Sequence, residues 1–186
     1  MKSIAVFLLT VFAASCLFAQ PREGKHVELS LSGGYQHYSS DNSDGTSAFL
    51  LCPRVGVFLI EGLELEPEFT LMTVSQGDPM YMVNGNVSYN FRAAGKGVPF
   101  LLIGYGLSNT VPVFNVPMVR TDFSIGVLNI GAGVKIFITD DVAVRLEYRY
   151  QNFSGESEPS INPYYSYTTK VDVRMHTVQF GLSVLL

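Results

Sequence analysis

The sequence predicts an all-β protein, an eight-stranded antiparallel up-and-down transmembrane β-barrel. Apolar residues recur at every second position in eight segments, and no segment shows the spacing of an amphipathic helix. The residues between them are polar, and the connections alternate between short and long. The chain has 13 Phe and 10 Tyr but only 15% charged residues, which excludes a disordered polymer. We expect one domain over residues 20–186.

Residues 1–19 are expected to be a cleaved signal peptide. Lys2 supplies a positive start, Ile4–Ala14 forms a short apolar core, and Leu17-Phe18-Ala19 fits a cleavage site. The apolar run is too short for a permanent membrane helix. A rival cut before Cys16 would instead give a lipid-modified N-terminus. Either route takes the chain out of the cytoplasm.

The first four strands show the alternation clearly. The segments Val27–Gln36 and Phe49–Leu59 each place apolar residues on one parity. In Leu63–Leu71 the residue between two apolar ones is a glutamate three times in succession. In Tyr81–Phe91 the polar positions are nearly all amides and hydroxyls. Each segment therefore predicts a strand with one apolar and one polar face.

The fifth strand, Pro99–Ser108, lies in an uncharged stretch, Gly97–Val119, that hydropathy alone would allow as a membrane helix. Its prolines and glycines favour a strand followed by a long loop. The sixth, Phe123–Ile138, changes phase halfway, so we expect a bulge near Val127. Regular alternation returns in the last two strands, Val142–Gln151 and Thr177–Leu186.

The connections predict how the strands are joined. Three are short, at 60–63, 92–98 and 139–141. The long and polar or proline-containing connections are Ser39–Thr46, Asn109–Asp122 and Phe153–Val173. Short turns at one end and long loops at the other are typical of a barrel whose two ends face different compartments.

The number of apolar side chains decides which face points outward. Eight strands with about five large apolar residues each carry more than the narrow interior of an eight-stranded barrel can hold. The apolar parity should therefore face lipid, where a closed barrel also pairs every backbone group. The alternative is a secreted soluble barrel with the apolar parity inside, binding an apolar ligand.

The polar parity then lines the lumen with five acids and four bases. They are Glu28, Glu64, Glu66, Glu68 and Glu147 with Arg54, Lys135, Arg145 and Arg149. The third and seventh strands should lie on opposite walls, so that their carboxylates and guanidiniums meet across the interior and avoid the cost of unpaired buried charge. We expect a charge-plugged lumen, since an open pore needs a barrel of about 16 strands.

Two further features bear on the wall. Pro53 and Pro67 fall within strands, where proline removes a ladder hydrogen bond and a bulge is the expected explanation. Aromatic residues near the strand ends fit interfacial girdles. They are Tyr35, Phe49, Tyr81, Tyr89, Phe91, Tyr105, Phe123, Tyr148 and Tyr150.

The segment Leu128–Tyr150 and the alternating end Val178–Leu186 resemble the small outer-membrane β-barrel proteins of Gram-negative-type bacteria, the eight-stranded OmpA/OmpX-like group. The resemblance covers Lys25–Leu186. It implies a location in the bacterial outer membrane, contact with outer-membrane lipid and insertion by the barrel-assembly machinery. Members usually end on an aromatic residue, whereas this chain ends on leucine.

A second resemblance concerns the run Arg149-Tyr150-Gln151-Asn152-Phe153-Ser154, followed by Asn162-Pro163. It is similar to the motif of lipid A deacylase barrels, in which a His, a Ser two residues on and a downstream Glu form a triad. Ser154 matches the nucleophile, but Asn152 stands where the His should activate it. Glu156 and Glu158 are closer than the family pattern expects. A deacylase-like hydrolase with a degenerate or relocated site is thus the alternative function.

We therefore expect a non-enzymatic, monomeric barrel with a structural or surface-interaction role through its long loops, whose partner is unknown. A net charge of −4 without any basic run argues against nucleic-acid binding. His26, His37 and His176 are scattered, and after signal cleavage only Cys52 remains. No metal site, cofactor or internal disulfide is expected.

Overall fold

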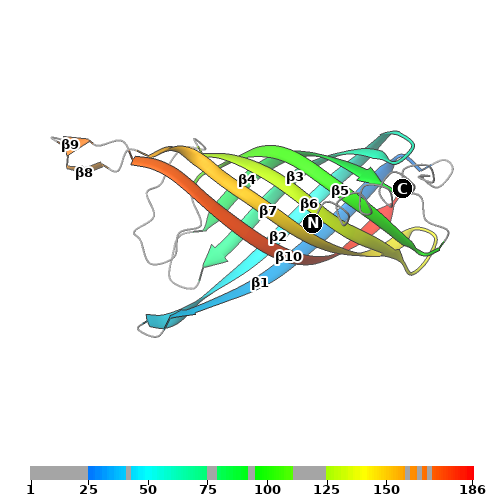
Figure 1. Ribbon diagram of the computed structural model, residues 1–186. Coiled ribbons are helices and arrows are strands. Elements are labelled where there is room, and N and C mark those ends of the chain that lie inside the picture. The colour runs from blue at the N-terminus through cyan, green and yellow to red at the C-terminus, as the bar shows by residue number, and fades with distance from the viewer. Residues whose placement is uncertain are drawn as a thin grey trace, which may run out of the picture.

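Eight strands close into a barrel in the order β1-β10-β7-β6-β5-β4-β3-β2, and every neighbouring pair is antiparallel. The computed structural model describes residues 25–40, 43–74, 79–91, 95–110, 125–157, 160–162, 165–166 and 169–186. Figure 1 shows the strands winding around one axis. The predicted eight-stranded antiparallel barrel is confirmed. The expected signal peptide, residues 1–19, lies outside the described residues.

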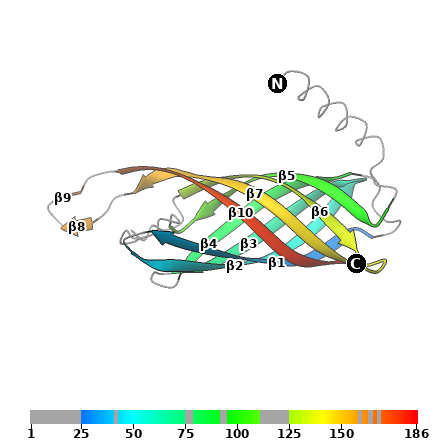
Figure 2. The ribbon, with the colours of Figure 1, turned by 60° about the horizontal axis from the view of Figure 1, so that its bottom comes forward.

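The barrel strands are β1 (Val27–Ser40), β2 (Ser43–Ile60), β3 (Leu63–Val74), β4 (Met80–Asn90), β5 (Gly97–Ser108), β6 (Ile125–Phe137), β7 (Val142–Ser157) and β10 (Thr169–Leu185). A separate two-stranded pair, β8 (Ser160–Asn162) and β9 (Tyr165–Ser166), protrudes beyond one end of the barrel (Figures 1 and 2). The described part of the chain contains no helix that is long and apolar enough to span a membrane.

The apolar parity of the strands lies on the outside of the wall. Leu31 is 51% exposed, Val83 55% and Phe180 63%, although all three are large apolar side chains. Their sequence neighbours Ser30 and Asn84 are buried inside. Because successive side chains of a strand point to opposite faces, the alternation in the sequence becomes an apolar exterior around a polar interior. This is the polarity that a barrel in lipid requires.

Short turns close one end of the barrel. In the β2–β3 turn Gly62 has a φ of 75°, a left-handed conformation that glycine adopts without strain. Its carbonyl oxygen accepts a hydrogen bond from the Asn90 backbone N–H at 2.7 Å. The β6–β7 turn is tied to the start of β1, because Lys25 Nζ lies 2.5 Å from Asp141 Oδ1. Short turns mark the periplasmic end in barrels of this kind.

The expected loop Ser39–Thr46 at the opposite end is wrong. β1 continues to Ser40, β2 begins at Ser43, and Tyr38 pairs with Thr46. The physical reason is that antiparallel pairing uses backbone hydrogen bonds alone. The ladder therefore continues where the residues do not alternate, and the pattern that marks a strand in the sequence is absent there.

The expected loop Phe153–Val173 is shortened in the same way. β7 continues to Ser157 and β10 begins at Thr169, and these two residues pair at the tip of the ladder. Of the expected loop Asn109–Asp122, only the first two residues are described. The described residues at the outer end therefore include two long hairpins, β1–β2 and β7–β10.

The expected bulge near Val127 is also wrong. Val127 pairs in continuous register with Gly106 on β5 and with Phe153 on β7. Ile125 and Val127 simply point inward and are 1% and 0% exposed. The phase changes because the lumen itself becomes apolar toward the outer end. The residues of this apolar cluster are Ala48, Leu50, Cys52, Met72, Met80, Met82, Ile125, Val127, Phe153 and Met175.

The strand prolines are not at bulges either. The register shifts in these strands fall between Tyr38 and Ser40 and between Phe58 and Ile60. The pairs on either side of Pro53 and Pro67 keep one register. A proline that points its ring outward can occupy a strand without shifting it, at the expense of its ladder hydrogen bond.

Several aromatic side chains occupy the outer surface as expected for a girdle. Phe91 is not exposed: it follows the last residue of β4, is 5% exposed and packs edge-on against Tyr89 at 5.1 Å. Phe123 lies outside the described residues. Exposed on the exterior are Tyr35, Phe49, Tyr105 and Tyr148.

The closed wall predicts heat-modifiable migration on SDS gels. Purified protein in detergent should migrate differently before and after boiling, because SDS does not open a ladder in which every strand has two partners until heat disrupts it. Circular dichroism of the same two samples checks that the mobility change follows loss of β-structure. Identical migration, together with partition of the protein into the aqueous phase of a detergent extraction, would contradict the barrel in lipid.

Candidate functional site: the interior charge network

Nine charged side chains from five strands meet inside the barrel. Each is at most 3% exposed, and each lies on the inward parity of its strand. We call them the charge network. They are Glu28 on β1, Arg54 on β2, Glu64, Glu66 and Glu68 on β3, Lys135 on β6, and Arg145, Glu147 and Arg149 on β7. The structure thus brings together all nine residues that the sequence pattern singled out.

Carboxylates of β3 contact guanidiniums of β7 across the lumen. The two strands are four places apart in the ring of eight, and so lie on opposite walls. Arg149 donates two hydrogen bonds to Glu68, from Nη1 to Oε1 at 2.7 Å and from Nη2 to Oε2 at 2.9 Å. Arg145 Nη2 lies 2.9 Å from Glu66 Oε2. Two-pronged arginine–carboxylate pairs combine strength with fixed geometry, so they brace the two walls.

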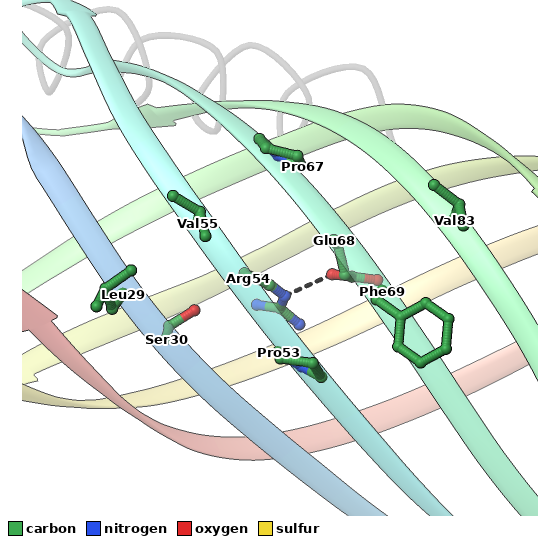
Figure 3. A pocket seen from close by; sticks show the side chains of 9 residues that line it. All are labelled: Leu29, Ser30, Pro53, Arg54, Val55, Pro67, Glu68, Phe69 and Val83. Atoms are coloured by element: carbon green, nitrogen blue, oxygen red, sulfur yellow. Dashed lines mark hydrogen bonds and ion pairs between the residues drawn. The ribbon is translucent and has the colours of Figure 1, made fainter.

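Arg54 links four strands from one guanidinium. Its Nε donates to Glu68 Oε2 on β3 at 2.5 Å, and Nη1 donates to Glu147 Oε2 on β7 at 2.8 Å. Its Nη2 donates to Gln179 Oε1 on β10 at 2.7 Å. Figure 3 shows the Arg54–Glu68 pair behind the wall formed by β2 and β3. Glu68 lies on the neighbouring strand, whereas Glu147 and Gln179 are 93 and 125 residues away in sequence, and only barrel closure brings these two within reach.

Lys135 joins a third set of strands. Its Nζ lies 2.6 Å from Glu28 Oε2 on β1 and 2.8 Å from Glu64 Oε2 on β3. Beside it, Arg145 Cζ lies over the Phe100 ring at 4.3 Å, a distance at which the ring face attracts a cation. Every base of the charge network therefore contacts at least two other groups.

Neutral polar side chains complete the network. Gln151 Nε2 donates to Asn129 Oδ1 at 2.8 Å, and Asn129 Nδ2 donates to Asn84 Oδ1 at 3.1 Å. These three amides were not among the predicted site residues; for Asn84 the signal was the amide and hydroxyl parity of the fourth predicted strand. Each β3 glutamate accepts a hydrogen bond from β4: Glu64 from Asn90 at 2.9 Å, Glu66 from Ser88 at 2.5 Å and Glu68 from Asn84 at 3.0 Å.

Because the side chains of the charge network are buried, their charges must be paired. An ion taken out of water costs several kcal/mol unless partners replace the lost hydration, and no member of the charge network has access to bulk solvent. Five carboxylates face four cations, so the network carries a net charge of −1 when all are ionised. Its geometry holds walls together and fills space.

The expected hydrolase residues lie elsewhere, on the outside of β7. Ser154 is exposed and pairs with Asp172, and Asn152 pairs with Arg174. His176 stands four residues from Asp172 along β10, about 13 Å at the rise of a strand. His176 therefore does not reach the Ser154 hydroxyl, and its Nδ1 instead shares a 2.6 Å hydrogen bond with the Tyr148 hydroxyl.

The remaining acids of the hydrolase motif contribute no described side chain. Glu158 lies outside the described residues, as does the side chain of Glu156. Among the residues that the structure does describe, no three His, Cys, Asp or Glu side chains are grouped so as to hold a metal ion. The charge network thus remains the candidate site.

Comparison with known proteins agrees with this fold. The crystal structure of Neisserial surface protein A covers 86% of this chain and 96% of its own, with a TM-score of 0.62 at 17% identity. The N-terminal β-barrel domain of Pseudomonas aeruginosa OprF covers 88% and 100%, with 0.59 at 15%. A de novo designed transmembrane β-barrel covers 89% and 98%, with 0.53 at 10%. No curated protein matches the chain.

The lipid-facing exterior and the paired charges within define a small integral membrane β-barrel. The family profile described as "outer membrane protein beta-barrel domain" matches residues 4–184. The chain therefore belongs to this outer-membrane β-barrel family and resides in the bacterial outer membrane.

Replacing Arg145 by Met should destabilise the barrel by about 3–5 kcal/mol, because it leaves the Glu66 carboxylate buried without its cation. Arg174→Met is the matched control, since Arg174 is 67% exposed in a 4.0 Å pair with Asp172; its loss should cost about 1 kcal/mol or less. Urea unfolding in lipid vesicles, followed by circular dichroism, measures both. Equal effects of the two substitutions on the free energy of unfolding would show that the buried pair contributes no more to stability than the exposed one.

Proposed function

We propose that this protein is a non-enzymatic outer-membrane barrel with a charge-plugged lumen, which acts structurally and through its outer hairpins at the cell surface. The observation that carries the proposal is the charge network itself. Arg54, Arg149 and Lys135 each join strands from different parts of the wall at 2.5–2.9 Å. Moving an ion through the lumen would require several such contacts to break together.

Two further layers support a closed lumen. Beside the charge network lie the hydrogen-bonded amides of Asn84, Asn129 and Gln151. Toward the outer end follows the apolar cluster, whose members Met72, Met80 and the others are at most 5% exposed. A permeating ion would thus lose hydration against apolar side chains as well as against paired charges.

The long hairpins support a role at the surface. The β1–β10 ladder ends at Gly33 and Phe180, whereas β10 and β7 remain paired as far as Thr169 and Ser157. Beyond that point the β1–β2 and β7–β10 hairpins extend away from each other (Figures 1 and 2). Outward extensions on a rigid scaffold are where binding specificity usually lies.

Membrane lipid and the barrel-assembly machinery are the other proposed partners, and we infer that the protein is monomeric. The exterior supports the lipid contact, because its apolar residues surround the wall. The same observation weighs against a secreted soluble barrel with an apolar ligand inside, since Leu65 is 41% exposed while its neighbour Glu66 is 1% exposed. The alternating C-terminal strand is the segment that the assembly machinery would meet.

The lumen is expected to carry no steady ion current. Purified protein inserted into planar bilayers should give a silent baseline, because the charge network holds the two walls in contact. The double variant Glu66→Ala/Arg145→Ala removes one cross-lumen pair together with its volume, and it should produce transient currents. Arg174→Ala, outside the lumen, should remain silent. A steady, uniform conductance from the unmodified protein would refute the plug.

No lipid A deacylase activity is expected, because Asn152 occupies the position of the base and His176 lies too far from Ser154. Lipid A from cells with and without the protein should have the same acyl composition by mass spectrometry. Cells expressing Ser154→Ala provide the matched comparison. Loss of a hydroxyacyl chain only in cells with the unmodified protein would establish the alternative function.

A further inference from the structure

A groove of about 570 Å³ runs over the outside of the wall where β2 meets β3. Figure 3 shows its lining, with Pro53 and Pro67 on the two adjacent strands and Phe69 at one side. Most of the lining side chains are apolar. The full set is Leu29, Ser30, Pro53, Arg54, Val55, Pro67, Glu68, Phe69 and Val83.

The two prolines interrupt the ladder beneath this groove. β2 and β3 pair at Leu51–Leu71 and again at Arg54–Glu68, but neither proline has a partner on the opposite strand. We call this part of the β2–β3 ladder the seam. On their other sides the prolines do have partners, since Pro53 pairs on β1 and Pro67 on β4. Each lacks the N–H that a ladder needs. In hydrocarbon no water replaces a missing backbone bond, so this seam has a local defect that faces lipid.

The inner side of the seam is braced by the charge network. Arg54 and Glu68 follow the two prolines directly, and their side chains meet inside at 2.5 Å. Because Arg54 also binds Glu147 and Glu68 also binds Arg149, both groups are fully engaged with partners in the lumen. They therefore close the floor of the groove and leave no charge to attract a polar ligand from outside.

The shape of the groove comes from side chains of unequal height. The rings of Pro53 and Pro67 are short, and Gly85, which pairs with Pro67 on β4, has no side chain. Taller residues rise beside them: Phe69 is 43% exposed and stacks against Tyr81 with centroids 6.2 Å apart, and Val83 is 55% exposed. The result is an elongated apolar depression within the exterior that contacts lipid.

We propose that this groove is an ordered binding site for one acyl chain of an outer-membrane lipid. Its occupant must be hydrocarbon, because the groove is continuous with the apolar exterior and its only charged lining residues are paired inside. A chain lying along Pro53 and Pro67 fills the space that the short side chains leave over the interrupted ladder. The site lies on the outer face of the wall, opposite the Arg54–Glu68 pair that closes its floor.

The absence of tryptophan from the chain allows a direct test. Phe69→Trp places a single fluorophore at the rim of the groove. Phe180→Trp is the matched control, since Phe180 is 63% exposed on β10 and does not line the groove. The two phenylalanines lie at similar distances from the periplasmic ends of their strands, six residues from Leu63 and five from Leu185.

Each variant is reconstituted in phosphatidylcholine vesicles in which a rising fraction of the lipid carries brominated acyl chains, and fluorescence quenching is recorded. Ordered binding predicts that the Trp at position 69 is quenched at a lower brominated fraction than the Trp at position 180. Repeating the series with brominated phosphatidylglycerol should give the same shift if the acyl chain, and not the headgroup, is recognised. Coincident curves for the two positions would overturn the proposal.

The second part of the experiment fills the groove with one substitution and restores a backbone N–H beneath it with another. Gly85→Leu in the Phe69→Trp background adds an apolar side chain beside Pro67 at a position where a Cβ meets nothing closer than the Tyr105 carbonyl oxygen at 4.0 Å. Pro67→Thr restores the missing N–H. Both variants should move the position-69 curve onto that of position 180 while keeping heat-modifiable mobility. A position-69 shift that persists in both folded variants would likewise overturn the proposal.

Discussion

Lipid offers no hydrogen-bond partner to a peptide group, and this constraint governs the whole structure. It requires the strands to close on themselves, since an open edge would leave N–H and C=O groups unpaired. It also inverts the usual polarity, so that Leu31, Val83 and Phe180 are exposed while arginines are buried. The apolar exterior and the closed strand order both follow from this one requirement.

The interior is the consequence of that inversion. With the apolar parity directed at lipid, eight strands leave a narrow lumen lined by the polar parity, and its charges must neutralise one another there. The third and seventh strands supply most of these charges and lie on opposite walls, so their ion pairs connect the two walls across the lumen. Buried ion pairs often add little net stability but strongly penalise any change that separates them, which suits a wall that must stay closed.

The place where the constraint is relaxed is the seam at Pro53 and Pro67. There the wall loses ladder hydrogen bonds, and the lost contacts are compensated from two sides: the Arg54–Glu68 pair within and, in our proposal, an acyl chain outside. At this seam a lumen residue and a lipid-facing residue that are adjacent in sequence stabilise the same strand from its two faces. It also links the charge network to the surrounding membrane.

The period-two pattern by itself determined the number of barrel strands and which charged side chains line the lumen, because a pleated strand leaves no other way to separate alternating residues. The lengths of the connections indicated the antiparallel order. The pattern failed where that rule loses force. The hairpin around Ser39–Thr46 is paired through its backbone without alternating apolar residues, and the phase change at Val127 reflects a lumen that turns apolar rather than a bulge. The partners of Arg54 on β7 and β10 were decided only by the tertiary structure, since they depend on how far the strands stagger when the sheet closes, and no local sequence feature encodes that stagger.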